Sequence, residues 1–293
     1  MSKTGGGRGT NQYQIKGRSI ARDRNVRGTR AEPEVDLQIP REYRATPVSH
    51  LGFPSESDLG VQSLCRTSVE RVAERYMSMR AEFAFASGHL EGNSFTLPEV
   101  YTLLDGRAPE GRTHEEIDQI LALTEASENL LDSVRAGTFR LDLDHADRMN
   151  KLLSQYEAIS PGVRRAHSPI NSDGRGATVN VMGDIFTGYN KTELESVEVD
   201  LLERTAEIRH PAARAFVFAA GTAYAQMYFD GNKRTGRYMA DGELMSHGFD
   251  AVAIPAKRRS EYQHSVAEMF RTADLTPYAS FLADVARNPS AVA

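Results

Sequence analysis

The sequence contains one cysteine, Cys65, among 293 residues, and this scarcity excludes an intrachain disulfide and a cysteine-based metal site. The apolar helical spacing around Cys65 predicts that it is a core residue. No run of about 18 apolar residues occurs, and the N-terminus lacks the apolar stretch of a secretory signal. We therefore expect a cytoplasmic protein without membrane contact.

Signatures of several enzyme classes are also missing. The sequence has no paired spacing of metal-binding residues and no Gly-x-Ser-x-Gly element, so it supports neither a zinc enzyme nor a Ser-His-Asp hydrolase. No internal repeat is visible. An apolar fraction of 40% and a mean hydropathy of -0.47 are typical of a soluble globular protein with one large domain or two small ones.

Charge is unevenly distributed along the chain. Residues 1–30 carry eight Lys or Arg and one Asp, which leaves 27 of the 35 basic and 39 of the 40 acidic residues for the rest of the chain. Glycine runs and missing apolar periodicity predict a basic, disordered or linker-like tail from residue 1 to about residue 45. We expect no nucleic-acid partner beyond weak electrostatic contact by this tail.

Helical patterns dominate from about residue 55, so the predicted fold is mainly α. One long amphipathic helix is predicted by apolar residues at three- and four-residue spacing, namely Cys65, Val69, Val72, Tyr76, Met79 and Phe83. Alternating residues 178–181 and 185–187 around a Gly183-Asp184 turn predict a hairpin, the only clear β signal. Capping and breaking residues predict further helices after Thr113, at 149–156, 193–208 and 211–224, from Thr235, from Arg259, and up to about Arg287.

One stretch combines a carboxylate, an amide and three cations at a glycine turn that opens a helix. It reads Tyr228-Phe229-Asp230-Gly231-Asn232-Lys233-Arg234-Thr235-Gly236-Arg237. A helix start favours phosphate, and Arg234 and Arg237 lie on one helical face where they can grip its oxygens. Asp230 could hold a divalent cation that bridges phosphates. The stretch is therefore a candidate anion cradle; a surface turn followed by a solvated basic helix start is the alternative.

A second stretch ends in Gly-Asn, as many helices do, and its residues alone predict a helix C-cap and loop. It reads Ser87-Gly88-His89-Leu90-Glu91-Gly92-Asn93. Both stretches resemble motifs of the Fic family, which has the Fido fold. Residues 228–237 are similar to His-x-Phe-x-Asp-Gly-Asn-Gly/Lys-Arg-x-x-Arg, and residues 87–93 to Ser/Thr-x-x-x-Glu-Gly/Asn, the inhibitory motif of members with an N-terminal inhibitory helix.

The resemblance implies a Fic/Fido helical bundle with a small β-hairpin flap, and an activity that transfers AMP from ATP to a protein hydroxyl. The flap would hold the backbone of a target by strand addition. The implied organisation is a tail at 1–45, an N-terminal helical region at 46–160 with the inhibitory motif at 87–93, and a Fic core at 161–290 with the flap at about 177–190 and the active-site motif at 226–237.

The resemblance also implies a role for each matching residue. Asp230 would hold Mg²⁺, and Gly231 with Asn232 would form the anion hole for the phosphates of ATP. Arg234 would contact the phosphates and Arg237 the γ-phosphate. Glu91 would pair with Arg237 and keep the γ-phosphate out. The remaining implied residues are Lys233 and Gly236 for nucleotide binding, and Ser87, Gly92 and Asn93 for inhibition.

Three positions depart from the family pattern. Tyr228 replaces the usual phenylalanine, and Gln226 replaces the catalytic histidine, the general base. Glutamine has no titratable group near neutral pH, and positioned acid–base catalysis is typically worth ~10²- to 10⁴-fold. We therefore expect weak or unconventional AMP transfer, with Glu91, His247 and His264 as candidate substitutes for the base. At the position of Lys233 many members have glycine, whereas death-on-curing relatives, which can act as kinases, have lysine as this sequence does.

Two alternative functions follow from these departures. One is a catalytically inactive, nucleotide-binding regulatory pseudo-enzyme. The other is different phosphate chemistry in the same cradle, such as phosphotransfer, nucleotide hydrolysis or modification of a small-molecule hydroxyl.

Overall fold

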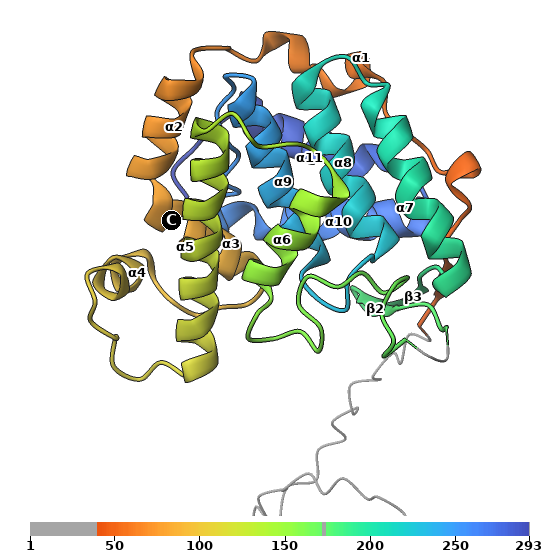
Figure 1. The fold of residues 1–293 in the computed structure, drawn as a ribbon, viewed down its shortest axis with the longest axis horizontal. Coiled ribbons are helices and arrows are strands. Elements are labelled where there is room, and N and C mark those ends of the chain that lie inside the picture. The colour runs from red at the N-terminus through yellow and green to blue at the C-terminus, as the bar shows by residue number, and fades with distance from the viewer. Residues whose placement is uncertain (1–39, 172–173, 293) are drawn as a thin grey trace, which may run out of the picture. The chain divides into compact units, whose positions relative to one another are not determined.

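The computed structural model describes residues 40–171 and 174–292, and two helices form the centre of this part of the chain. α8 (Pro211–Ala225) and α9 (Asn232–Ser246) run side by side and are buried along most of their length (Figure 1). A Cβ atom at Gly236 would lie 2.8 Å from the carbonyl oxygen of Ala219, so glycine is needed for this close approach. The two helices fix both ends of the loop that joins them.

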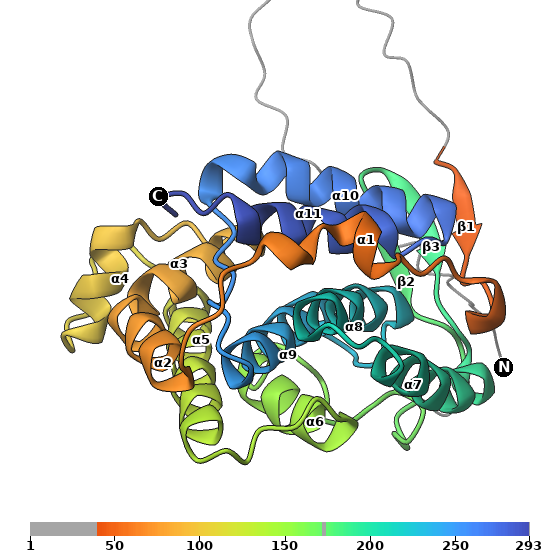
Figure 2. The ribbon, with the colours of Figure 1, turned by 90° about the horizontal axis from the view of Figure 1, so that it is seen from above.

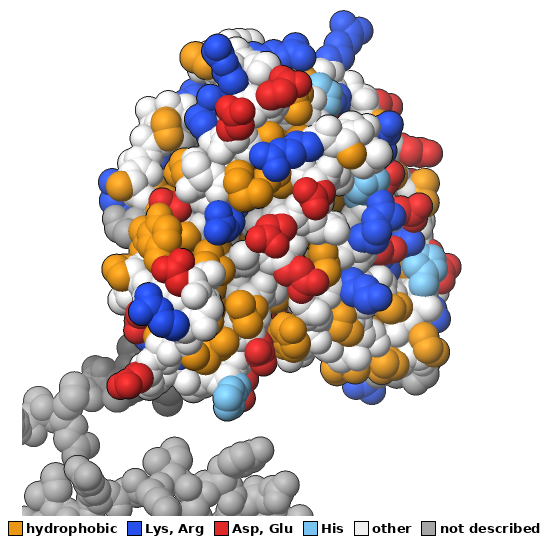
Figure 3. Space-filling model, turned by 60° about the vertical axis from the view of Figure 1, so that its left-hand side comes forward, with side chains coloured by type: hydrophobic (Ala, Val, Ile, Leu, Met, Phe, Trp, Pro, Cys, Tyr) orange, Lys and Arg blue, Asp and Glu red, His pale blue; other side chains and the backbone are white. Residues whose placement is uncertain are grey.

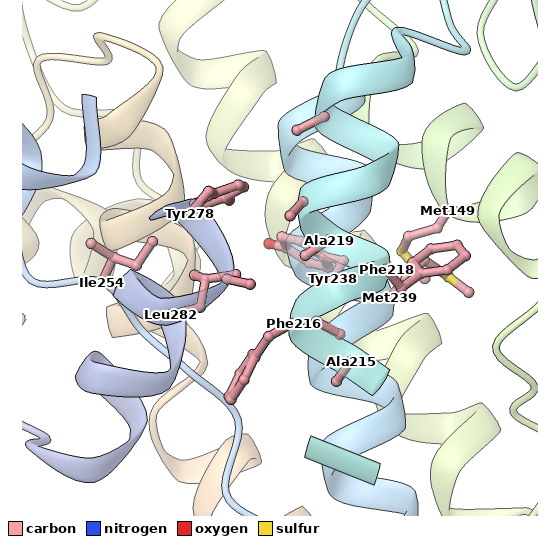
Figure 4. Close-up of a cluster of buried hydrophobic side chains, with 14 of the residues drawn as sticks. Met149, Ala215, Phe216, Phe218, Ala219, Tyr238, Met239, Ile254, Tyr278 and Leu282 are labelled. Carbon is pink, nitrogen blue, oxygen red and sulfur yellow. The ribbon is translucent and has the colours of Figure 1, made fainter. Parts of the chain in front are cut away.

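Apolar side chains on both sides of this helix pair form the core (Figure 4). Phe216 points toward Leu282 on α11 (Thr276–Arg287). On the other side, Phe218 and Met239 lie beside Met149 on α6 (Leu143–Leu153). All five side chains are buried, and burying such a side chain contributes roughly 1.5–3 kcal/mol. The core therefore holds α8 and α9 firmly in place.

The other helices surround this pair, with α7 against α8, and α5 and α2 against α9 (Figure 2). Among the described residues, no helix is long and apolar enough to cross a membrane. The mainly helical fold that we expected is confirmed. The remaining helices are α1 (Glu56–Leu59), α2 (Val69–Ser78), α3 (Arg80–Leu90), α4 (Leu97–Leu104), α5 (His114–Arg135), α7 (Lys191–Ala206) and α10 (Arg259–Thr272), with 3-10 turns at Val48–His50, Val61–Ser63 and Ala256–Arg258.

A small sheet lies beside the end of α8. The predicted hairpin is confirmed as β2 (Thr178–Val181) and β3 (Asp184–Thr187), joined by a turn with positive φ at Met182 and Gly183. A third strand, β1 (Glu42–Arg44), pairs parallel to β3, so the order is β1-β3-β2 and β2 is an edge strand. β3 is anchored because the buried ring of Phe186 packs against Tyr224 and Phe270.

Three sequence predictions need correction here. The tail does not extend to residue 45, because Glu42–Arg44 forms β1; its residues 1–39 lie outside the described part of the chain. The single long helix is two helices, since the backbone of Met79 leaves the helical region (φ -108°, ψ 17°). Cys65 is exposed rather than buried, because Ser68 caps α2 and leaves Cys65 in the preceding loop.

The surface seen in Figure 3 carries acidic and basic side chains that alternate without a continuous basic strip. Nucleic-acid grooves usually show such a strip, so this face has no electrostatic footprint of that kind.

Candidate functional site

The predicted cradle lies in residues 226–231, here called the motif loop, and in the first turn of α9. Gln226 ends α8 with a left-handed backbone (φ 52°), and Gly231, also left-handed (φ 74°), precedes α9. No side chain of the described residues caps the start of α9. Its first N–H groups and positive dipole end therefore face the motif loop, as an anion site requires.

Two asparagines hold the motif loop in this shape. The side chain of Asn232 accepts a hydrogen bond from the N–H of Tyr228 (2.8 Å) and donates to its carbonyl oxygen (2.9 Å). Asn150, fully buried on α6, donates to the carbonyl oxygen of Asp230 (2.9 Å) and to the hydroxyl of Thr235 (3.0 Å). The loop therefore depends on α6 as well as on its own residues.

The motif loop, the hairpin, α10 and the end of α3 line one cavity of about 400 Å³. Residues 178–182 of the hairpin form one wall, and residues 229–234 form another. Glu91 and Tyr262 also line the cavity, as does Gln226. The structure thus brings together the predicted flap, the active-site motif and the predicted inhibitory glutamate.

Residues 87–93, here called the inhibitory segment, reach the cradle through Glu91. Glu91 Oε1 accepts a hydrogen bond from Arg237 Nη2 at 3.0 Å, and the hydroxyl of Ser87 accepts one from the same nitrogen at 3.3 Å. Arg237 Nη1 donates to the hydroxyl of Tyr262 at 2.7 Å. These contacts use donors on both terminal nitrogens of the Arg237 guanidinium.

The charge of Glu91 is strongly favoured in this position. Burial opposes ionisation, but the charges of Arg237, Lys233 and Arg234 outweigh it and lower the pKa of Glu91 to about 2. Lys233 Nζ lies 3.9 Å from Glu91 Oε2, and its side chain is 39% exposed. Glu91 lines the cavity whereas Arg237 does not, so the carboxylate stands between Arg237 and the cavity.

Asn93 and Gly92 fix the end of the inhibitory segment. Gly92 takes a positive φ of 98°, a conformation that glycine adopts without strain. Asn93 Nδ2 donates to the carbonyl oxygen of Glu116 and to the side chain of Gln119, both at 3.0 Å on α5. The segment is therefore fastened to the same helix bundle that carries the cradle.

Arg234 is held by Glu157. Its side chain is 3% exposed and forms a two-pronged ion pair with Glu157, in the turn after α6. Arg234 Nη1 also donates to the carbonyl oxygen of Leu153 at 3.1 Å, and Nη2 lies 3.5 Å from Asp230 Oδ1. Arg234 Nε is buried without a partner among the described residues.

Asp230, the predicted metal ligand, is 52% exposed and lines the cavity. Its Oδ1 accepts a hydrogen bond from the N–H of Gly231. Within residues 40–171 and 174–292, no group of three His, Cys, Asp or Glu side chains could hold a metal. A cation at Asp230 would thus need phosphate oxygens and water for its other positions, which is the usual coordination of Mg²⁺ beside a nucleotide.

Gly236 does not have the predicted position in the nucleotide site. It is buried against the backbone of α8 at Ala219 and does not line the cavity. Its small size serves the packing of α8 against α9, because a side chain there would collide with backbone atoms that cannot move aside.

Two of the three candidate bases lie outside the cavity. His247 follows the far end of α9 and contacts the carbonyl oxygen of Glu243 at 2.9 Å. His264 is exposed on α10 and contacts the carbonyl oxygen of Ser260 at 2.7 Å. Neither histidine lines the cavity, so both predictions are wrong. Of the three candidates, Glu91 alone faces the site.

Sequence reasoning missed Asn150, Glu157 and Gln119, although all three support the cradle through side-chain contacts. Nothing in the local sequence distinguishes these residues from ordinary polar positions. Their contacts are with residues more than 20 positions away along the chain, and only the packed helices bring them together.

Comparison with known sequences gives two kinds of result. No protein-family model matches the chain. Relatives named protein adenylyltransferase Fic are 25% identical over 198 residues in Drosophila mojavensis and 26% identical over 201 residues in Drosophila melanogaster. Each alignment covers 67% of this chain but 37% and 38% of the two relatives, so the chain spans well under half of their length.

Solved structures share the fold. A Fic domain-containing signalling protein of Bacteroides thetaiotaomicron matches with a TM-score of 0.60 and 18% identity, covering 79% of this chain and 91% of that one. Fic-1 of C. elegans matches with a TM-score of 0.59 and 18% identity, covering 78% and 68%. These similarities in sequence and fold, together with the motif at 226–237, show that the chain belongs to the Fic family.

Proposed function

We propose that the protein is a Fic-type adenylyltransferase that binds Mg-ATP in the 400 Å³ cavity, is restrained by Glu91, and transfers AMP slowly because Gln226 replaces the base. The ion pair between Glu91 and Arg237 carries this proposal. A carboxylate on this guanidinium competes with a phosphate for the same donors. The names of the Drosophila relatives support the same reaction.

AMP transfer joins the oxygen of a target hydroxyl to the α-phosphorus of ATP, and the bond between that phosphorus and the oxygen bridging to the β-phosphorus breaks. Pyrophosphate leaves, and the hydroxyl proton must go to an acceptor. Such chemistry depends on positioning and charge neutralisation. The first turn of α9, Lys233 and Arg234 would bind the phosphates, and Asp230 would hold Mg²⁺, which neutralises phosphate charge when bound.

The hydroxyl could belong to a protein segment or a small molecule. β2 supports a protein target, because it is an edge strand whose residues line the cavity. An extended segment that added to this edge would present its side chains to the cradle. Gln226 could orient the hydroxyl through a hydrogen bond, but its amide cannot take the proton.

One observation favours a second candidate function, a nucleotide-binding pseudo-enzyme. Both ends of the Gln226 amide are engaged within the protein: Nε2 donates to the carbonyl oxygen of Ala223 at 2.6 Å, and Oε1 accepts from Asn232 Nδ2 at 3.3 Å. A side chain engaged in this way has neither end of its amide free for a target hydroxyl, and the cavity has no histidine among its described lining residues.

Labelling separates these functions. The wild type, Glu91→Gly, Gln226→His and the double variant are incubated with cell lysate and ATP labelled at the α- or the γ-phosphate. We expect α-label on protein to rise in Glu91→Gly and to rise again in the double variant, by up to ~10²- to 10⁴-fold for a restored base. Asp250→Gly, which removes an exposed carboxylate from Arg75, is the control.

Each other outcome has a definite meaning. Protein labelled from γ-labelled ATP indicates phosphotransfer, and released phosphate indicates hydrolysis. Tight ATP binding without transfer in any variant, including the double variant, selects the pseudo-enzyme. Absence of ATP binding in every variant would overturn both proposals.

A further inference from the structure

A chain of side-chain hydrogen bonds connects the inhibitory segment to Arg234. Asn93 Nδ2 donates to Gln119 Oε1 at 3.0 Å, and Gln119 Nε2 donates to Glu157 Oε1 at 2.8 Å. Glu157 in turn holds Arg234 through both of its oxygens. Glu157 accepts from three donor atoms, Gln119 Nε2 and both terminal nitrogens of Arg234, and its carboxylate has no hydrogen to donate, so Gln119 must turn its NH₂ group toward it. The donated hydrogen bonds therefore run from Asn93 through Gln119 to Glu157, which also accepts the hydrogen bonds of Arg234.

The contacts of Arg234 determine which of its edges can reach a ligand. Glu157 binds the end of the guanidinium through Nη1 and Nη2, and the carbonyl oxygen of Leu153 takes a further donor on Nη1. The remaining edge carries Nη2, which lies 3.5 Å from Asp230 Oδ1, and Nε, which is buried and has no partner among the described residues. Arg234 also lines the cavity. Glu157 thus fixes the orientation of the guanidinium and leaves the N–H groups of its other edge outside this ion pair.

We propose that Gln119 and Glu157 are positioning residues that couple the inhibitory segment to Arg234. This inference rests on the proposed nucleotide site. Glu91 occupies Arg237 and opposes binding, whereas Asn93, through Gln119 and Glu157, keeps Arg234 oriented for binding. The segment then has two opposite effects on one cradle, exerted by residues two positions apart.

The proposal distinguishes two ways of removing the inhibition. Replacing Glu91 alone frees Arg237 and leaves the path from Asn93 to Arg234 intact. Displacing the whole segment also frees Arg237 but takes Asn93 away from Gln119, so that Arg234 loses support. A merely obstructive segment would give the same nucleotide affinity in both cases, because only its carboxylate would matter.

The test measures the Kd for Mg-ATP by calorimetry in the full chain with Glu91→Gly. Gln119→Met is added, because methionine keeps the volume of glutamine and removes both hydrogen bonds. The matched control is Gln155→Met, since Gln155 Nε2 donates to Glu125 Oε2 at 2.9 Å between the same turn and the same helix but without contact to Arg234. Hydrogen exchange of residues 91–95 and 154–165 is measured on the same proteins without nucleotide.

We expect Gln119→Met to weaken ATP binding by roughly threefold to tenfold, the net effect of one typical hydrogen bond, and to speed hydrogen exchange in both segments. Gln155→Met should change neither the hydrogen exchange of residues 91–95 nor the Kd for Mg-ATP. Equal Kd values in the two variants, at equal thermal stability, would overturn the proposal. If Glu91→Gly itself binds no ATP, the proposed function fails. Independently of ATP, hydrogen exchange that stays slow in residues 91–95 or 154–165 of the Gln119→Met variant would disprove the proposed coupling.

Discussion

The most direct prediction concerns the effect of Glu91 on nucleotide affinity. In the folded protein Arg237 donates to Glu91 at 3.0 Å, and the carboxylate separates Arg237 from the cavity. ATP must displace this contact before its terminal phosphate can bind the same guanidinium. Glu91→Gly removes the competitor, and Glu91→Gln removes its charge while keeping its volume. Both variants should therefore bind Mg-ATP more tightly than the wild type.

The magnitude follows from the pKa of Glu91. Burial alone would raise it, but the neighbouring cations, Arg237 foremost, bring the pKa from the ordinary 4.5 down to about 2. A difference of this size corresponds to about 3 kcal/mol of preference for the charged form. If all of it opposed the nucleotide, affinity would rise by on the order of 10²-fold on removal of the charge. This value is an upper limit, because ATP can also bind without the Arg237 contact.

Calorimetric titration with Mg-ATP at pH 6, 7 and 8 tests this reasoning. The folded pKa of Glu91 lies far below this range, so the carboxylate stays charged and the ratio of wild-type to variant Kd should not change with pH. Glu99→Gln is the control, because hydrogen bonds from Arg112 and Thr96 also lower the pKa of Glu99 to about 2, but Glu99 does not line the cavity. Equal affinities for wild type and Glu91→Gly, or a ratio that varies over this range, would refute the competition.

Two further predictions concern stability. The hydroxyl of Tyr228 donates a hydrogen bond to Asp147 at 2.8 Å. Tyr228→Phe should therefore lower the free energy of unfolding by about 1–2 kcal/mol and the calorimetric Tm by about 2–6 °C. An unchanged Tm would contradict the role of this hydrogen bond. Burial raises the pKa of Asp241 to about 7, although the hydrogen bond from the N–H of Val252 acts in the opposite direction. The stability that the neutral carboxyl contributes is therefore complete below pH 3.8, the ordinary pKa, and is lost as the pH rises through 7. Asp241→Asn should therefore exceed the wild type in Tm at pH 8 and match it near pH 4, and parallel pH profiles of Tm would disprove this.

Local signals in the sequence predicted several elements correctly. The alternation at 178–187 predicted the hairpin, because a period of two on both sides of a glycine indicates that structure without help from the rest of the chain. The turn itself lies at Met182-Gly183, one residue earlier than the predicted Gly183-Asp184, because Asp184 pairs with Val181 as part of β3. The pair His210-Pro211 gave the start of α8, since a side-chain cap and a proline act within one turn. The Asp-Gly-Asn break likewise indicated that a helix begins close to Gly231, where α9 starts.

What the sequence could not supply depends on contacts between distant segments. β1 has three residues and exists only because β3, about 140 positions later, offers it an edge. The apolar spacing through Met79 was the same on both sides of the break between α2 and α3, so periodicity could not locate it. Glu157 lies in a polar turn with no pattern, and its pairing with Arg234 follows from the packing of α6 against α9.

The backbone conformation at Gln226 allows a substitution that tests whether the cradle lacks only a general base. Its left-handed conformation is held from outside: the N–H of Arg165 donates to the carbonyl oxygen of Met227 at 2.7 Å, and Arg165 Nη1 donates to that of Gln226 at 3.2 Å. Neither contact uses the side chain of residue 226, and histidine tolerates a positive φ well. Gln226→His should thus change the chemistry without moving the loop. Transfer restored by histidine would identify the base as the missing element, whereas continued inactivity with ATP bound would locate the defect in the geometry of the phosphate contacts.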